Sequence, residues 1–448
     1  MTGTSEHVSP ALIAKGLSEV DCAGVLVAAM TSPEWMRRRV ESVEFLQDSS
    51  INRRVSADVV VPDYLPRVGS GSSAVRLLPI ALLEKRPLVS FDARDASGSS
   101  VPVLSTVENG HISGAALCWV AENIPTKHTL QEDAKRLLHR LANDAPDSAR
   151  ESLKALEQSA DGAVVRRRLG PWLERLADGF LLIAAISGDS PVNQIIKFCY
   201  EQRYEMEHQG DGIEAEDSRA AAVRKKALGR VGRVLGTRAR SVELALPGAP
   251  MCHSFHFEAT TPDDVDLPDA RLLRRTSDGD SKIIRSRSAT ERYARRQHLF
   301  ADVDISVEDP RVKLVLRPSA SGWWLRCVLS SLLVALTLGV TSWRIDEAME
   351  SGPGSDLAAL VVVIVGLAST ALARPGAHEL AVRLTPGIRV LALGSASLPY
   401  AAGLTIAFGA KSCYVDDLLG WLTVAAVAAF LALAMPYLLV RYASEVRG

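Results

Sequence analysis

A cysteine and two histidines lie within five positions in MCHSFHFEAT, residues 251–260, and zinc prefers thiolate and imidazole ligands. The alternating aromatic residues and the flanking prolines favour a strand over a helix. In a strand, His253 points away from Cys252 and His256. Cys252 and His256 share a face but lie about 13 Å apart, too far for one ion bound through bonds of about 2 Å. We therefore predict a partly buried strand and no metal.

Two carboxylates, Asp92 and Asp95, stand close together in FDARD, a composition that suits acid–base chemistry or metal binding. The surrounding sequence, PLVSFDARDASGSSVPVLS, is typical of a hairpin with its turn at residues 95–98. A hairpin turn accounts for both acids without a catalytic role, and we favour that interpretation.

The remaining motifs lack the partners that catalysis requires. GSGSS at residues 69–73 has the composition of a phosphate loop, but no lysine follows it, so we predict a flexible linker. His111, His128 and His139 are too dispersed to suggest a triad, and no hydrolase, zinc-protease, Cys-x-x-Cys or dinucleotide motif occurs. We predict no catalytic residue and no cofactor, and expect that the protein is not an enzyme. The six cysteines show no paired spacing, which favours a reducing compartment.

Apolar residues are concentrated near the C-terminus. The mean hydropathy is +0.10 although 23% of residues are charged. Four apolar stretches each approach the roughly 20 residues that cross a bilayer as a helix: residues 323–343, 357–373, 390–408 and 418–440. The sequence therefore predicts an α-helical transmembrane bundle of four helices within residues 319–448.

The charges beside these stretches predict an orientation. The loop RIDEAMESGPGSD after the first stretch carries one arginine and four acids, whereas arginines flank the opposite ends of the stretches. Because basic flanks stay in the cytoplasm, we expect both termini and the region before the first span to be cytoplasmic, in a multi-pass protein of the plasma membrane. The span interiors contain no acid, lysine or histidine, so a coupled transporter is not expected.

Two groups of residues could contact the bilayer or line a path through it. The third span carries small residues suited to helix packing or to a pore-lining face: Gly394, Ser395, Ser397 and Gly403. A basic segment after an acidic block could be a solvated surface, or could contact anionic lipid headgroups at about 1 kcal/mol per basic residue through Arg224, Lys225, Lys226, Arg230 and Arg233. The net charge of −1 gives no reason to expect a nucleic-acid partner.

The region before the spans is predicted to be α+β. Residues 1–50 form a helical segment, in which a helix starts at Ser32-Pro33-Glu34 and runs through WMRRRVESVEFL. Residues 51–240 form an α+β domain, with a Thr129–Glu132 capping box and with GFLLIAAIS and NQIIKFCYE as a strand pair. Six short strands in residues 241–318 suggest a small antiparallel β-sandwich close to the membrane.

The order of these pieces resembles a family of uncharacterised multi-pass membrane proteins of high-GC Gram-positive bacteria, from roughly residue 50 to the end. The stretches that carry the resemblance are PIALLEKRPLVSFDARDASGSSVPVLSTVENG, IIKFCYE, SFHFEATTPDDVDLPDARL, KLVLRPSASGWW and ALARPGAHEL. The resemblance implies a soluble N-terminal region followed by a transmembrane bundle, and it implies no activity, cofactor or catalytic residue.

Two function classes fit these features. The first is a membrane-anchored cytoplasmic binding, sensing or scaffold protein, whose partners are the lipid bilayer and either another protein or a second copy of the chain. The alternative is a membrane effector or pore-forming protein that is gated by its own cytoplasmic domain. Depolarisation of cells on overproduction would favour the effector.

Overall fold

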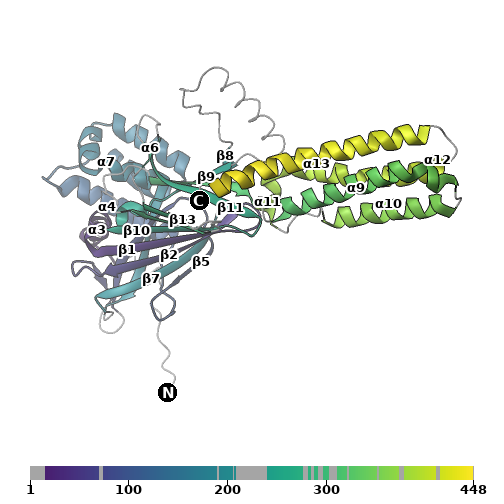
Figure 1. Ribbon diagram of the computed structural model, residues 1–448. Coiled ribbons are helices and arrows are strands. Elements are labelled where there is room, and N and C mark those ends of the chain that lie inside the picture. The colour runs from purple at the N-terminus through teal and green to yellow at the C-terminus, as the bar shows by residue number, and fades with distance from the viewer. Residues whose placement is uncertain are drawn as a thin grey trace.

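The chain forms a β-rich region with a helical layer on one side and a long helical bundle projecting from the other, as the computed structural model shows (Figure 1). The structure describes residues 16–69, 74–188, 191–204, 206–207, 240–275, 281–283, 287–290, 296–301, 310–319, 322–350, 353–372, 378–409 and 414–446.

The largest sheet has seven strands in the order β13-β14-β10-β1-β2-β7-β5. Neighbouring strands are antiparallel except for β1 and β10, which pair in parallel. The strands are β1 (Met36–Phe45), β2 (Ser50–Val60), β5 (Val89–Arg94), β7 (Asn193–Arg203), β10 (Ser254–Thr260), β13 (Arg287–Thr290) and β14 (Arg296–Ala301).

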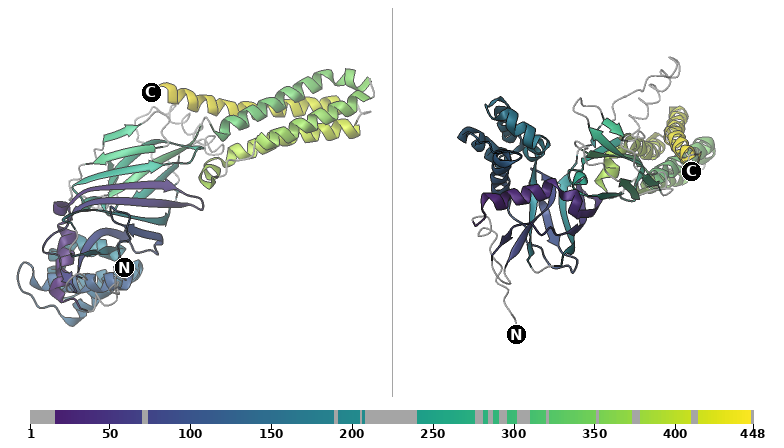
Figure 2. Two further views of the ribbon diagram at one scale, coloured as in Figure 1. Left: turned by 90° about the horizontal axis from the view of Figure 1, so that it is seen from below. Right: turned by 90° about the vertical axis from the view of Figure 1, so that its left-hand side faces the viewer.

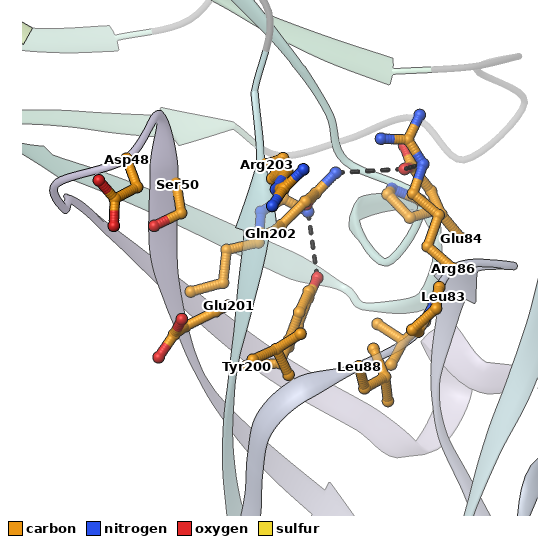
Figure 3. Close-up of a pocket in the computed structure, with 14 residues that line it drawn as sticks. Asp48, Ser50, Leu83, Glu84, Arg86, Leu88, Tyr200, Glu201, Gln202 and Arg203 are labelled. Atoms are coloured by element: carbon orange, nitrogen blue, oxygen red, sulfur yellow. Dashed lines mark hydrogen bonds and ion pairs between the residues drawn. The ribbon is translucent and has the colours of Figure 1, made fainter.

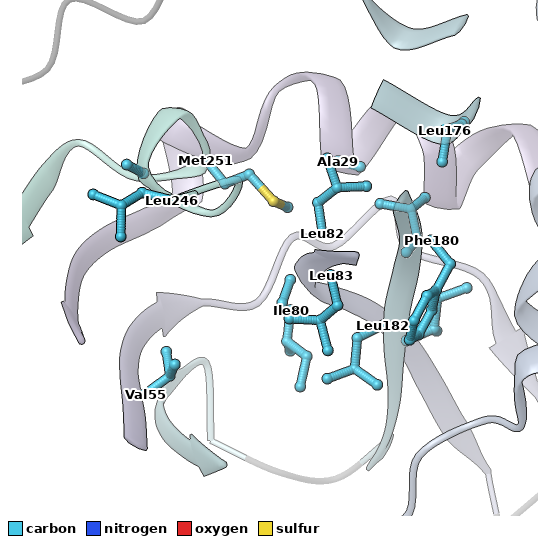
Figure 4. Close-up of a cluster of buried hydrophobic side chains, with 14 of the residues drawn as sticks. Ala29, Val55, Ile80, Leu82, Leu83, Leu176, Phe180, Leu182, Leu246 and Met251 are labelled. Atoms are coloured by element: carbon cyan, nitrogen blue, oxygen red, sulfur yellow. The ribbon is translucent and has the colours of Figure 1, made fainter. Parts of the chain in front are cut away.

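A three-stranded sheet, β3 (Arg67–Val68), β4 (Val75–Glu84) and β6 (Gly179–Ser187), lies between the seven-stranded sheet and the helices. Strands β4 and β6 are almost continuously apolar because both of their faces are covered. Figure 4 shows Ile80 and Leu82 of this layer among Ala29, Leu246 and Met251 from the elements around it. The helices are α2 (Glu19–Met30), α3 (Ser32–Trp35), α4 (Thr106–Asn123), α5 (Glu132–Asn143), α6 (Pro146–Gln158) and α7 (Gly162–Asp178).

A five-stranded antiparallel sheet lies next to the membrane bundle (Figure 2). Its inward-facing Val312, Leu314 and Leu316 are fully buried and belong to the same core cluster as the other two sheets. Its order is β12 (Ser281–Ile283), β11 (Val265–Arg275), β15 (Pro310–Pro318), β9 (Arg240–Ala245) and β8 (Met206–Glu207).

In the C-terminal part, the described residues contain three helices that are long and apolar enough to cross a membrane, over Trp323–Arg344, Pro386–Ala407 and Asp417–Leu438. Another helix packs against them, and its described apolar stretch, Ala359–Ala371, is shorter. The helices are α9 (Trp323–Glu350), α10 (Pro353–Leu372), α11 (Glu379–Leu384), α12 (Pro386–Gly409) and α13 (Tyr414–Val446).

Three local predictions were wrong. The helix that begins near Ser32 ends at Trp35, and the chain continues as strand β1, Met36–Phe45. The sequence hides the alternation of this strand because the charged Arg39 and Glu41 occupy its buried face. The Thr129–Glu132 capping box does not form: Gln131 is the N-cap of α5, and its amide donates to Asp161 Oδ2 at 2.8 Å. The strands GFLLIAAIS and NQIIKFCYE exist, but they do not pair with each other. The first is apolar on both faces and joins the three-stranded sheet, whereas the second joins the seven-stranded sheet.

The six strands predicted in residues 241–318 are present, but they are shared between two sheets. Strand β10 pairs in parallel with β1, so the predicted boundary at residue 240 is crossed by strand pairing. The sequence pattern of short strands located these six strands but missed β13 (Arg287–Thr290), and it contains no information about which distant strand completes each sheet.

Candidate functional site

Three charged side chains lie on the inward face of the seven-stranded sheet: Arg39 and Glu41 of β1 and Arg53 of β2. Each is at most 2% exposed. Glu41 Oε2 lies 3.6 Å from Arg39 Nε, and Glu41 Oε1 lies 3.3 Å from Arg53 Nη1. We call this group the arginine–glutamate triad. Its two cations and one anion leave a net positive charge in the core.

The triad connects the three sheets. Arg39 Nη1 donates to the carbonyl of Ile80 on β4 at 3.3 Å, and its guanidinium lies 5.6 Å from the ring centre of Phe198 on β7. Arg53 Nη2 donates to the carbonyl of Ala245 on β9 at 2.6 Å. A side chain at position 248 would collide with the Arg39 guanidinium, which explains the glycine there. The buried charges therefore fix how the sheets pack.

Tyr200 of β7 completes the cluster. Arg53 Nη1 donates to its hydroxyl at 3.2 Å. Burial raises the pKa of Tyr200, so the phenol keeps its proton. Burial by itself would lower the pKa of Arg53, but Tyr200 and Glu41 outweigh it and hold that pKa above its ordinary range. Arg53 is thus a permanent cation beside the neutral hydroxyl of Tyr200.

A pocket of about 520 Å³ opens above Arg53 and Tyr200, within the size range of small-molecule sites. Figure 3 shows Asp48 and Ser50 on one side and Arg86 on the other. The pocket has apolar walls and a charged rim, and its lining comprises Asp48, Ser50, Arg53, Leu83, Glu84, Arg86, Pro87, Leu88, Val89, Tyr200, Glu201, Gln202, Arg203 and Pro247.

Part of the rim is held by local contacts. Glu84 Oε2 lies 3.1 Å from Arg86 Nε and accepts a hydrogen bond from Gln202 Nε2 at 3.1 Å (Figure 3). This lining matches a ligand that has an apolar body and a polar end that accepts hydrogen bonds. The apolar body would contact Leu88 and Val89, and the polar end would face Arg53 and Tyr200.

Residues 254–260 of the MCHSFHFEAT stretch form strand β10, as predicted, with Phe255 and Phe257 buried. Cys252 precedes the strand and is buried, with its thiol donating to the carbonyl of Ala249 at 3.3 Å. His256 lies on the other face of β10 from the two phenylalanines, with Nε2 3.3 Å from Ser254 Oγ. Within the described residues, no cluster of three or more His, Cys, Asp or Glu side chains could hold a metal ion.

Asp95 begins the predicted hairpin turn, which is confirmed, and Asp92 lies in the preceding strand β5. Asp95 Oδ1 accepts from the amides of Ser97 and Ser99 at 2.8 and 2.9 Å, and these bonds, with that from the Ser97 hydroxyl, lower the pKa of Asp95. Asp92 pairs with Arg94 at 2.7 Å. The turn uses the carboxylate of Asp95, whereas the carboxylate of Asp92 pairs within β5.

The structure brings together two histidines that appear dispersed in the sequence. The rings of His111 on α4 and His139 on α5 stack with centres 6.4 Å apart. Burial and the neighbouring His111 lower the pKa of His139. His128 lies elsewhere, with Nε2 3.0 Å from Asp161 Oδ1. The helical spacing within α4 and α5 could not reveal this pairing, because it depends on how the two helices pack.

The predicted small-residue positions of α12 face in two directions. Ser395 and Gly403 are buried against the bundle, whereas Gly394 and Ser397 are exposed. A Cβ at Gly403 would lie 3.0 Å from Val363 Cγ2, but one at Gly394 would meet nothing within 4 Å. The basic group Arg224, Lys225, Lys226, Arg230 and Arg233, like most of GSGSS, lies outside the described residues.

Comparison with known proteins gives no further assignment. No protein-family model matches the chain, and no curated protein matches it significantly. The resemblance to membrane proteins of high-GC Gram-positive bacteria therefore stays a prediction.

Proposed function

We propose that the protein is a membrane-anchored sensor that binds a small molecule in the pocket above Arg53 and Tyr200. The observation that carries this proposal is the construction of the pocket: apolar walls above a buried cation and a phenol, at the point where three sheets meet. Sites of this kind bind small molecules by enclosing the apolar part and orienting the polar part.

The membrane part of the proposal adds a fourth span and an orientation. Helix α10 has 20 residues, about 30 Å of helix, and packs on α9 and α12. We assign it as the remaining span of a four-helix bundle. The basic flanks support a position of the sheet region and both termini in the cytoplasm, at the plasma membrane. The basic segment at residues 224–233 would contact anionic headgroups, and a protein partner or second copy would receive the signal.

The test is extraction of bound small molecules from the full-length protein, purified in nanodiscs, followed by mass spectrometry. Val89→Trp adds an indole at the wall of the pocket, and Val107→Trp is a matched control at an exposed position of α4. We expect one compound in stoichiometric amount from wild type and Val107→Trp and little from Val89→Trp. Equal recovery from Val89→Trp, or no compound from any of the three, would contradict the proposal.

The effector alternative rests on one feature of the bundle. Three buried hydroxyls, those of Ser331, Ser369 and Ser395, have no hydrogen-bond partner within the described residues. Unsatisfied hydroxyls inside a membrane bundle suit a path that admits water. An effector should depolarise cells when overproduced, and Gly403→Leu should remove that effect; normal membrane potential in overproducing cells would exclude this function.

A further inference from the structure

Helix α11 lies in the connection between two helices of the bundle, yet it packs on the sheet region. Leu380, Ala381 and Leu384 are buried in the same core cluster as the sheets, and α11 contacts β15. The connection between α10 and α12 is thereby attached to the part of the protein that contains the pocket.

Two polar contacts attach the start of α11 to the turn between β1 and β2. The amide of Asp48 donates to Glu379 Oε2 at 2.9 Å. His378 Nε2 donates to the carbonyl of Phe45 at 3.2 Å, while its Nδ1 accepts from the amide of Leu380 at 3.2 Å. One neutral tautomer of His378 satisfies both of its contacts. The helix therefore holds the turn at two points.

The same turn forms one side of the pocket. Asp48 and Ser50 both line it. The turn is tight, with left-handed φ values of 62° at Asp48 and 56° at Ser49, and the amide of Leu46 donates to the carbonyl of Ser50 at 2.9 Å. Asp48 thus lines the pocket and also donates to Glu379, so a ligand that displaces this residue also displaces the contact with α11.

Helix α11 also leads directly into the bundle. Thr385 Oγ1 donates to the carbonyl of Ala381 at 2.8 Å, and the amide of Arg389 in α12 donates to the carbonyl of Thr385 at 3.1 Å. A single residue, Thr385, separates α11 from α12, which starts at Pro386. A shift of α11 must therefore act on the end of α12.

We infer that residues 378–385 transmit the state of the pocket to the membrane bundle, through the contact of Glu379 and His378 with the β1–β2 turn. This inference rests on the proposed function for its biological meaning, but its physical content is a coupling between Val89, on the pocket wall, and Glu379, on α11. Such a coupling is measurable without the natural ligand.

The experiment measures amide hydrogen exchange by mass spectrometry on the full-length protein in nanodiscs. Val89→Trp acts as the occupant of the pocket, Glu379→Ala breaks the contact with Asp48, and the double variant combines them. We expect each single variant to change exchange in peptides covering residues 378–389 by about tenfold, the size of one charge-assisted hydrogen bond. In the double variant the two effects should not add, because both act through one contact.

The controls are Val107→Trp and Glu132→Ala, which alter exposed positions on α4 and α5. Neither should change exchange at residues 378–389. Unchanged exchange there in Val89→Trp, or strictly additive effects in the double variant, would overturn the inference. The outcome is independent of the extraction test: coupling without a bound compound would reject the sensor and retain the contact.

Discussion

The sheet region and the membrane bundle bury polar groups in different ways. The sheet region encloses full charges, in the arginine–glutamate triad of Arg39, Glu41 and Arg53. In the described part of the bundle, the buried polar side chains are hydroxyls, among them Ser330, Ser331, Ser369 and Ser395. The bundle relies on close packing of small residues, as at Gly403. The sheet region, in contrast, relies on paired charges.

The difference follows from what surrounds each region. The sheets are driven together by burial of apolar surface in water, which can offset the desolvation of a charged group when its partners are in place. Helices in a bilayer gain no such driving force from association, so their contacts depend on shape and on weak interhelical hydrogen bonds. The effect of a substitution should therefore differ sharply between the regions.

Loss of the triad's carboxylate should have the largest effect. Glu41→Gln keeps the shape of the side chain but leaves Arg39 and Arg53 without a counter-charge, which costs about 3–5 kcal/mol of unfolding free energy. The control is Glu44→Gln, since Glu44 pairs with Arg54 on the exposed face, where an ion pair contributes about 0–1 kcal/mol. Urea denaturation followed by tryptophan fluorescence measures both. Equal effects would show that the buried charges do not hold the sheets.

Overpacking of the bundle should have the next largest effect. Gly403→Leu pushes a side chain into Val363 and should destabilise the bundle by about 1–3 kcal/mol. Gly394→Leu adds the same atoms where nothing lies within 4 Å and should change little. Denaturation of the helices in mixed micelles, followed by circular dichroism, separates the two variants. A loss of stability in Gly394→Leu as large as in Gly403→Leu would place both glycines at contacts.

A partly buried lysine in the sheet region, Lys85, should give a pH dependence. Lys85 Nζ donates to the carbonyls of Leu141 and Asp144 at the end of α5, and burial lowers its pKa to about 8, despite Asp144 and Asp178. Between pH 8 and 10.5 the unfolded chain binds this proton and the folded chain does not, so the contribution of Lys85 to stability rises with pH across that window.

The measurement compares melting temperatures of wild type and Lys85→Gln from pH 7 to 10.5. The free energy of unfolding of wild type, relative to that of Lys85→Gln, should increase as the pH rises, by about 1 kcal/mol after discounting for solvent screening. Lys154→Gln, on the exposed side of α6, corrects for general effects of removing a lysine. A difference that falls with rising pH would mean that the folded state holds Lys85 charged.

The sequence predicted those parts of the fold in which each element carries its own pattern. The apolar run of β6, the turn at Asp95 and the long helices could be located, because burial on both faces, turn chemistry and span length are local properties. Strand β1 was missed because its inward face carries Arg39 and Glu41, whose partners lie on β2 and β4. The pocket was missed because its lining comes from four separate segments of the chain, which only the folded structure brings together.

An interhelical hydrogen bond in the bundle should have the smallest effect. Ser330 Oγ on α9 donates to the carbonyl of Ser369 on α10 at 3.1 Å. Such bonds contribute about 0.6 kcal/mol on average, because the separated helices also find partners, so Ser330→Ala should cost no more than this. Ser369→Ala, which removes a hydroxyl that has no partner within the described residues, should cost nothing. A cost above about 2 kcal/mol for either variant, in the same mixed-micelle denaturation, would mean that hydroxyls hold the bundle as firmly as charges hold the sheets.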